Sequence, residues 1–352
     1  MAKLIDKNIE LAETLPSEYY TDKEIFADIK SKIVNMWHFS AHEDQLSEKN
    51  IIPILHSKKL MNESIILTRD GVIKSLSNVC THRGMLVNTE PTKSNTLRCK
   101  YHGRTFDLNG CIKNMPKFEG VVNFPQYSDN LVGFSTMRWK GLLFTSLKER
   151  MNPEWIQFLE DRIGWLDIES FTHDSEYYRS YTINANWALY VDNYLEGFHI
   201  PYVHSGLNEV LSYDDYETEI FENGVLQIGI AKGEEDTFDI PEESKDYGKK
   251  IAAYYFWIFP GLMLNFYPWG LSVNLVVPLS VNKTEIIYQR YVGNSALIGD
   301  GAGGDLDKVE KEDQEIVEAV QIGVSSSSYD RGRYSPSMEK GVHYFHRILT
   351  EL

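Results

Sequence analysis

The chain has 352 residues, of which 42% are hydrophobic and 24% are charged, so a packed core is expected and disorder of the whole chain is not. Its formal net charge is −16, from 35 Lys and Arg against 51 Asp and Glu. This acidic balance argues against general binding to nucleic acid or to anionic membranes, which need basic surfaces. The sequence has no apolar run of the roughly 18 residues that span a membrane and no apolar signal core near its N-terminus. We therefore expect a cytoplasmic protein with one large domain or two.

The pattern along the chain predicts three parts. Residues 1–35 are acidic and predicted to be helical, and we expect them to pack with the C-terminal domain. Residues 36–150 contain short β-type runs in which Asp70-Gly71 and Asn109-Gly110 mark hairpin turns, as expected for a small antiparallel β domain. Residues 151–352 predict an α+β domain. Its predicted elements are helices over 187–198 and 305–323 and strands over 256–266, 272–279 and 285–292.

Two Cys-His pairs form the first group of candidate ligands, Cys80-Thr-His82 and Cys99-Lys-Tyr-His102. Each pair lies beside a predicted hairpin, so two loops would each offer one thiolate and one imidazole to a compact metal centre. Tetrahedral zinc is one interpretation. The other is a Rieske centre, in which two histidines replace two cysteines on one iron of a [2Fe–2S] cluster. The third cysteine, Cys111, is interpreted as a small apolar core residue.

A second group of candidate ligands lies in the predicted helix 187–198 and just after it. At 100° per residue, Asp192, Glu196 and His199 would share one helical face. His204 follows five residues after His199, and we expect Pro201 to kink the helix so that the two imidazoles converge. Two neutral histidines and one carboxylate form the facial triad of non-haem Fe(II) oxygenases, which leaves positions open for O₂ and substrate.

The third ligand of such a triad is expected on the predicted helix 305–323. Its apolar stripe contains Val309, Val317 and Val320, and Asp313 lies within that stripe. A carboxylate directed into a core is costly unless it is paired or binds a metal. Glu312 falls toward another face of the helix. The periodicity therefore favours Asp313 as the ligand.

The segments CTHRG, CKYHGRTFDLNG and VDNYLEGFHIPYVH resemble the catalytic α subunits of Rieske non-haem iron oxygenases, and the resemblance covers nearly the whole chain. It implies a Rieske domain at 36–150 and a helix-grip catalytic domain, an antiparallel sheet with helices, over 151–352. It further implies that the two Cys-His pairs hold the cluster. The implied ligands of the mononuclear iron are His199, His204 and Asp313. One departure is an arginine, Arg104, where the family usually has tryptophan.

The resemblance also implies partners. Glu196, at a position where most relatives have aspartate, would bridge the iron site to a cluster histidine of the neighbouring subunit in a head-to-tail homotrimer. Asp192 and Asn193 match family positions near the iron. Electrons from NAD(P)H would arrive through a separate flavin-containing reductase, with or without a ferredoxin, because the chain has no Gly-rich dinucleotide fingerprint.

Within the family, the segments around Glu196, PGLMLNFYPWGLSVNLVVPL and RGRYSPSMEKGVHYFHRIL resemble the choline, glycine betaine and carnitine monooxygenases. This implies hydroxylation or N-demethylation of a small quaternary ammonium substrate, held by cation–π attraction in an aromatic cage. The candidate cage residues are Tyr194, Phe198, Tyr202, Phe266, Tyr267 and Trp269. One alternative is a dioxygenase or demethylase acting on an aromatic acid, and a second is a non-catalytic zinc or electron-transfer protein.

Overall fold

The computed structural model describes residues 4–148, 151–212, 215–299, 301–304 and 306–352, without the side chain of Asn208. The chain forms two compact units, residues 33–152 and residues 1–32 together with 153–352. The predicted start at residue 1 and the predicted domain boundary at residue 150 lie outside the described residues. None of the described helices has the length and apolar character needed to cross a membrane.

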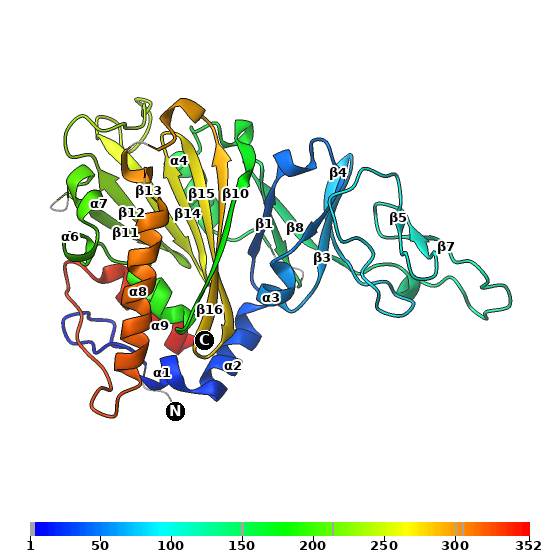
Figure 1. Cartoon of the computed structure of the whole chain (residues 1–352), viewed down its shortest axis with the longest axis horizontal. Coiled ribbons are helices and arrows are strands. Elements are labelled where there is room, and N and C mark those ends of the chain that lie inside the picture. The colour runs from blue at the N-terminus through cyan, green and yellow to red at the C-terminus, as the bar shows by residue number, and fades with distance from the viewer. Residues whose placement is uncertain (1–3, 149–150, 213–214, 300, 305) are drawn as a thin grey trace. The chain divides into compact units, whose positions relative to one another are not determined.

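Unit 33–152 contains two antiparallel sheets (Figure 1). The larger sheet has the order β1-β9-β8-β4-β3-β2, and the smaller has the order β5-β6-β7. The strands are β1 (His38–His42), β2 (Ile51–Ile54), β3 (Ile65–Asp70), β4 (Val72–Ser77), β5 (Leu97–Arg98), β6 (Thr105–Phe106), β7 (Ile112–Asn114), β8 (Gly133–Trp139) and β9 (Leu142–Ser146). The short helices are η1 (Glu43–Leu46), α3 (Ser57–Met61) and η2 (Tyr127–Asp129). Both predicted hairpins are confirmed, because β3 pairs with β4 and β6 pairs with β7.

The other unit is built on a seven-stranded antiparallel sheet with the order β10-β16-β15-β14-β13-β12-β11. Its strands are β10 (Thr172–Ile183), β11 (Glu217–Phe221), β12 (Gly224–Ile230), β13 (Ile251–Ile258), β14 (Leu262–Tyr267), β15 (Gly270–Ser280) and β16 (Lys283–Val292). Its α-helices are α1 (Glu18–Thr21), α2 (Lys23–Ile33), α4 (Trp155–Ile163), α5 (Trp187–Tyr194), α6 (Ile200–Val203), α7 (Ser205–Val210), α8 (Leu306–Val324) and α9 (Lys340–Glu351), and its 3₁₀ helices are η3 (Ile168–Ser170), η4 (Ser295–Leu297) and η5 (Gly301–Gly303). Helix α5 contacts β15, α9 contacts β11, and α8 packs on α5, so these helices cover the sheet (Figure 1). The predicted α+β class is confirmed.

The structure corrects three predicted elements. The single strand expected over 256–266 is the hairpin β13–β14, because Pro260 cannot donate to a ladder and Gly261 approaches the backbone of Val276 closely. The helix expected over 187–198 ends at Tyr194. Helical structure in the N-terminal segment begins only at α1. Strands β10, β11 and β12 and helix α9 were not predicted.

A buried ion pair holds the loop between β12 and β13 against α4. Arg162, whose side chain is 4% exposed, donates to the fully buried Asp246 at 3.0 Å and to Glu219 at 2.7 Å. The hydroxyl of Tyr254 donates to the other oxygen of Asp246 at 3.1 Å, and Lys249 approaches Asp246 at 3.3 Å from a more exposed position. The pair therefore compensates a carboxylate that has no access to water.

We expect Arg162→Met to lower the free energy of unfolding by about 3–5 kcal/mol, because it leaves the buried Asp246 carboxylate without its main partner. Lys32→Met is the matched control, since Lys32 forms an exposed pair with Asp28 and its loss should cost about 1 kcal/mol or less. Denaturant unfolding followed by circular dichroism measures both values. Equal stability of the two variants would contradict a structural role for the buried pair.

Candidate metal centres

Cys80 and Cys99 begin two loops that share one backbone pattern. The amide of Gly84 donates to the carbonyl of Cys80 at 2.9 Å, and the amide of Gly103 donates to the carbonyl of Cys99 at 3.0 Å. Both glycines have positive φ, +71° and +75°, a conformation that a side chain disfavours. The two loops therefore place Cys80 and Cys99 in equivalent positions, each with a histidine before the glycine.

The four side chains of these loops converge in pairs. The Nδ1 atoms of His82 and His102 lie 3.2 Å apart, and the thiols of Cys80 and Cys99 are buried within one apolar cluster. Burial raises the pKa of the Cys80 thiol, so a thiolate there depends on a bound cation. Among the described residues, no three of these donors lie within the 4.8 Å span of a single-ion site. The donor set fits a two-iron cluster with cysteines and histidines on different irons better than one zinc ion.

Arg104, which lies in the second loop, is hydrogen-bonded to the first. Its side chain is 2% exposed and donates to the hydroxyl of Thr81 at 2.7 Å and to the carboxylate of Asp129 at 3.1 Å. Its guanidinium also lies over the rings of Phe118 and Phe124, with centroid distances of 5.7 and 5.4 Å. Arginine at this position therefore keeps aromatic packing and adds charge-assisted hydrogen bonds between the loops.

Cys111 is exposed, which corrects the prediction of a core residue. It directly follows the turn at Asn109-Gly110, and its amide donates to the carboxylate of Asp107 at 2.8 Å.

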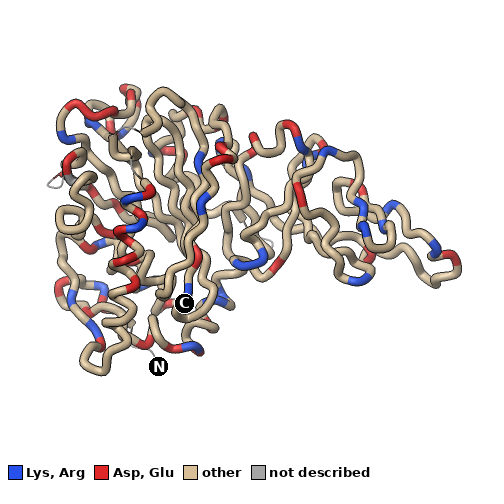
Figure 2. Tube along the Cα trace, in the orientation of Figure 1, with Lys and Arg blue, Asp and Glu red and all other residues tan. Residues whose placement is uncertain are grey.

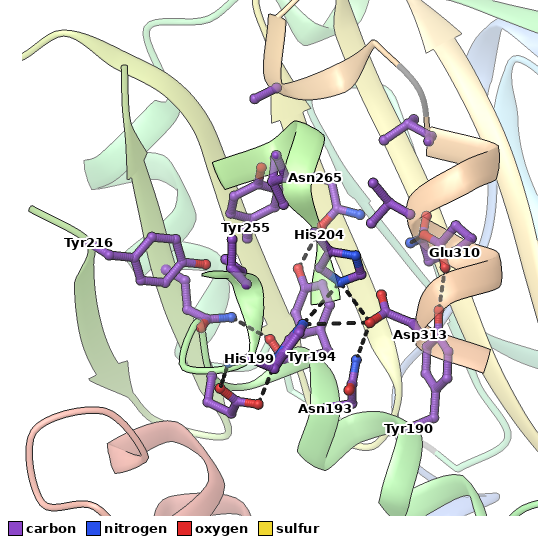
Figure 3. A pocket seen from close by; sticks show the side chains of 18 of the residues that line it. Tyr190, Asn193, Tyr194, His199, His204, Tyr216, Tyr255, Asn265, Glu310 and Asp313 are labelled. Atoms are coloured by element: carbon purple, nitrogen blue, oxygen red, sulfur yellow. Dashed lines mark hydrogen bonds and ion pairs between the residues drawn. The ribbon is translucent and has the colours of Figure 1, made fainter. Parts of the chain in front are cut away.

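In the other unit, His199, His204 and Asp313 form a group that is able to hold a metal ion (Figure 3). The two Nε2 atoms lie 3.2 Å apart, and Asp313 Oδ1 lies 2.9 Å from Nε2 of His204 and 3.5 Å from Nε2 of His199. Two ligands at right angles, each roughly 2.1 Å from an ion, would be about 3.0 Å apart. The three donors therefore match one face of a metal coordination sphere.

The two histidines are brought together because the helical structure is interrupted between α5 and α6. Glu196 accepts the amides of Phe198 and, at 3.0 Å, of His199, which spans the interruption, and α6 begins at Ile200. Pro201 lies in the first turn of α6, where its missing donor costs nothing. The predicted single helical face is therefore wrong, and Pro201 starts a helix instead of kinking one.

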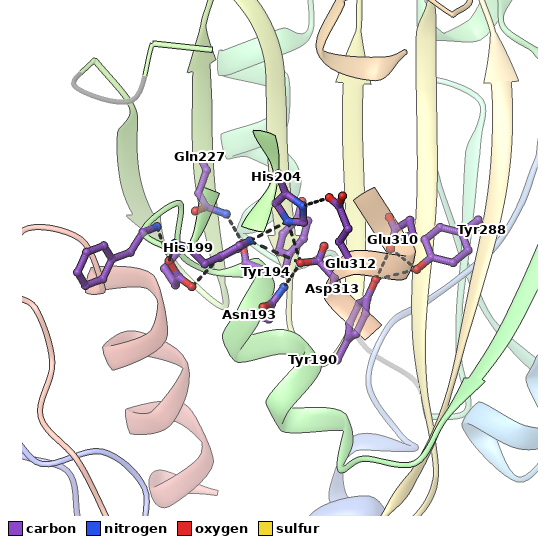
Figure 4. Close-up of polar contacts among 12 residues, drawn as sticks. Tyr190, Asn193, Tyr194, His199, His204, Gln227, Tyr288, Glu310, Glu312 and Asp313 are labelled. Atoms are coloured by element: carbon purple, nitrogen blue, oxygen red, sulfur yellow. Dashed lines mark hydrogen bonds and ion pairs between the residues drawn. The ribbon is translucent and has the colours of Figure 1, made fainter. Parts of the chain in front are cut away.

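Each histidine is oriented by a carboxylate on its other ring nitrogen (Figure 4). Glu196 Oε1 lies 2.7 Å from Nδ1 of His199, and Glu312 Oε2 lies 2.8 Å from Nδ1 of His204. Asn193 donates to Asp313 Oδ1 at 2.7 Å. A carboxylate on Nδ1 fixes the tautomer in which Nε2 is free to bind a metal. The helical periodicity placed Glu312 on another face of α8 than Asp313, so the contact of Glu312 with His204 was not predicted.

The environment of His204 favours positive charge. Burial by itself lowers the pKa of His204, but the hydrogen bonds and charges of Asp313 and Glu312 outweigh that effect and raise it. The same two carboxylates would favour a metal cation bound at Nε2.

Asp192 is engaged elsewhere. It accepts the hydroxyl of Tyr20 at 2.8 Å and pairs with Nε2 of His346 at 2.8 Å, so it links the N-terminal segment and α9 to α5. It is not among the described residues that line the pocket of the triad, whereas Asn193 and Glu196 are. Its assignment as a catalytic residue stays a prediction.

The triad opens into a pocket with tyrosine walls (Figure 3). Tyr194 comes from α5, Tyr255 from β13 and Tyr267 from β14, and Tyr216 lies against Gly197, where a Cβ would come within 3.0 Å of its ring. Of the candidate cage residues, Tyr194 and Tyr267 line this pocket, and their role in a cage stays a prediction. Tyr216 and Tyr255 also line it and were not predicted.

The other candidate cage residues do not line this pocket. Tyr202 is 81% exposed and Phe198 is 40% exposed, since both follow the interruption after α5. Phe266 is fully buried on the opposite face of β14 from its neighbours Asn265 and Tyr267, as the two-residue period of a strand requires. Trp269 stacks on Tyr267 with ring centroids 5.2 Å apart and supports that wall.

Glu310, one turn before Asp313 on α8, also lines the pocket and was not predicted. Its Oε2 accepts the hydroxyl of Tyr190 at 2.6 Å and that of Tyr288. Burial, followed by the negative charge of Asp313, raises the pKa of Glu310 to about 7. Helix α8 has six carboxylates and two lysines, so acidic residues predominate along it (Figure 2). Of these residues, Glu310 and Asp313 line the pocket.

Comparison with known families decides what these two centres are. Residues 36–125 match the family model of the Rieske [2Fe-2S] domain, and residues 165–352 match that of the ring hydroxylating alpha subunit, catalytic domain. The chain belongs to the Rieske oxygenase family. It is therefore a Rieske-type oxygenase with a Rieske [2Fe–2S] cluster and a mononuclear iron, and the alternative of a non-catalytic zinc or electron-transfer protein is wrong.

Similar proteins span nearly the whole chain. Chloroplastic choline monooxygenase from Arabidopsis thaliana is 30% identical, covering 97% of this chain and 83% of that protein. The carnitine monooxygenase oxygenase subunit of Escherichia coli K12 is 29% identical, with 98% and 95% covered. A solved structure of the quaternary ammonium Rieske monooxygenase CntA with L-carnitine is 25% identical and has a TM-score of 0.80, with 98% and 96% covered.

We expect Glu312→Ala to weaken ferrous iron binding by about 10–100-fold, because His204 loses the carboxylate that orients it. Glu315→Ala is the matched control, since Glu315 is exposed on the same helix. Anaerobic competition with a coloured chelator measures the affinity, and the visible spectrum of the cluster reports that the other unit is intact. Unchanged iron affinity in Glu312→Ala would show that this contact does not orient a ligand.

Proposed function

We propose that this chain is the oxygenase component of a Rieske non-haem iron monooxygenase in which His199, His204 and Asp313 hold the mononuclear iron. The support is the convergence of their three donor atoms, with the second nitrogen of each imidazole bonded to a carboxylate. The cluster would be held by the two equivalent loops that begin at Cys80 and Cys99. The bound iron supplies activation of O₂, and the residues around it hold the substrate and exclude water.

The proposed substrate is a small quaternary ammonium compound. The observation that carries this is the set of five tyrosines that line the pocket of the triad, Tyr190, Tyr194, Tyr216, Tyr255 and Tyr267. Tyrosine faces attract a trimethylammonium group by cation–π interaction. The relatives named for choline and carnitine oxidation support the same substrate class.

The proposed reaction inserts one atom of O₂ into a C–H bond next to the nitrogen and reduces the other atom to water with two electrons and two protons. The hydroxylated carbon then loses the amine and leaves as an aldehyde. The electrons would come from NAD(P)H through a separate flavin-containing reductase and reach the iron through the cluster. Because cytoplasmic conditions keep thiols reduced, the cytoplasm suits the two cluster cysteines.

We further propose a head-to-tail homotrimer in which Glu196 accepts a hydrogen bond from His102 of the partner subunit. Glu196 holds His199 and also lines a second depression, where the apolar Ile316 and Val320 are 39% and 42% exposed. An exposed apolar rim beside a carboxylate fits a subunit contact. A structure of the quaternary ammonium Rieske monooxygenase, 25% identical to this chain, is described in terms of inter-subunit electron transfer.

We expect O₂ uptake when the protein is supplied with NADH, a flavin reductase and quaternary ammonium compounds, with release of formaldehyde or another aldehyde. An oxygen electrode measures the consumption of O₂, and an aldehyde assay measures the product. His204→Ala is the control, because it should keep the cluster spectrum and lose O₂ uptake. Uptake with aromatic acids alone would instead assign the protein to the aromatic-acid alternative.

We expect Glu196→Gln to lower product formation by about 10–100-fold in a single turnover started from reduced cluster, because the proposed bridge loses its charge. Product is compared per bound iron, because Glu196 also orients His199, and the rate of cluster reduction should remain unchanged. Rapid mixing with O₂, followed by the absorbance of the cluster, measures its reoxidation. Normal reoxidation in the variant would argue against Glu196 as the bridge.

A further inference from the structure

Glu310 is a pocket carboxylate without a cationic partner. Its Oε2 is saturated by the hydroxyls of Tyr190 and Tyr288, while its Oε1 has one long contact, 3.4 Å from the amide nitrogen of Asn274. Among the described residues, no lysine or arginine pairs with it. A buried carboxylate with no counter-ion is unfavourable, so it either takes up a proton, as the raised pKa of Glu310 indicates, or binds a ligand that supplies the missing charge.

The mononuclear iron does not supply that charge. Fe(II) carries two positive charges, and Asp313, which contacts both imidazoles, and Glu312, which pairs with His204, already provide two negative ones. Glu196 adds a third beside His199. The carboxylate of Glu310 therefore remains in excess when the iron is bound, and the pocket still favours a cation.

The pocket also has a free acceptor at Gln227 on β12. The Nε2 atom of Gln227 donates to the carbonyl of Tyr194 at 2.6 Å, which fixes the orientation of the amide. Its Oε1 is buried and has no hydrogen-bond partner among the described residues. A buried acceptor without a partner is costly, so a ligand that donates a hydrogen bond to this oxygen, for example from a hydroxyl group, would be favoured.

No lysine or arginine is present among the described residues that line the pocket. A carboxylate on the substrate would therefore find Glu310 and the oxygen of Gln227, which repel it, and no lysine or arginine to pair with it. We infer that Glu310 is the counter-ion of the substrate ammonium group and that the pocket selects cationic amino alcohols over carboxylate-bearing betaines. This inference rests on the proposed function and names the specificity-determining residue.

The test uses the iron-loaded protein under anaerobic conditions, titrated calorimetrically with choline, L-carnitine and 3,3-dimethylbutan-1-ol. The last compound has the shape of choline with carbon in place of the charged nitrogen. We expect the unaltered protein to bind choline at least about tenfold more tightly than either of the other two. Glu310→Gln should bind choline about as weakly as the neutral compound, and Glu310→Asp, which keeps the charge, should retain the preference.

Glu315→Gln, an exposed change on the same helix, is the matched control and should bind like the unaltered protein. Undiminished choline preference in Glu310→Gln would overturn the role of Glu310 while leaving the proposed function intact. Equal affinity of the unaltered protein for carnitine and choline would overturn the selectivity. Binding of aromatic acids with no binding of any quaternary ammonium compound would overturn the proposed function, and the inference with it.

Discussion

The catalytic pocket depends on the placement of four carboxylates around two imidazoles in a largely buried space. Coulomb repulsion between such groups is strong where water is excluded, so the arrangement is favourable only with positive charge bound. The raised pKa of Glu310 is one sign of this constraint, and the raised pKa of His204 is another. An iron ion and a cationic substrate would together supply the charge that the protein lacks there.

Each of the two histidines proposed as iron ligands is oriented in the same way, by a carboxylate on Nδ1. Glu196, which lies between α5 and α6, is hydrogen-bonded to Nδ1 of His199, and Glu312 on α8 is hydrogen-bonded to Nδ1 of His204. Because both histidines are fixed through the far nitrogen, their Nε2 atoms meet although one follows α5 and the other follows α6. In the two Cys-His loops the backbone conformation positions the side chains instead, because two glycines with positive φ produce equivalent turns.

The convergence of the candidate cluster ligands, and that of His199, His204 and Asp313, could be predicted from the sequence because their residue types are rare and closely spaced. Paired Cys-His motifs and His199 with His204 need only local geometry to be recognised, and the apolar stripe of α8 was enough to select Asp313. The helix expected to carry Glu196 and His199 was wrong, because helical periodicity was continued through Gly197. That glycine permits close contact with Tyr216, a tertiary contact that local sequence does not reveal.

The pocket walls could not be predicted, because they depend on strand parity and on contacts between distant elements. A shift of one residue exchanges Phe266 for Asn265 and Tyr267, and the sequence of β14 alone does not set which of them faces the pocket. The position of Glu310 could have been predicted, since it lies three residues before Asp313 and so on the same side of α8. The contact made by Glu312 could not, because its partner is more than a hundred residues away in sequence and becomes a neighbour only when α8 packs on α5.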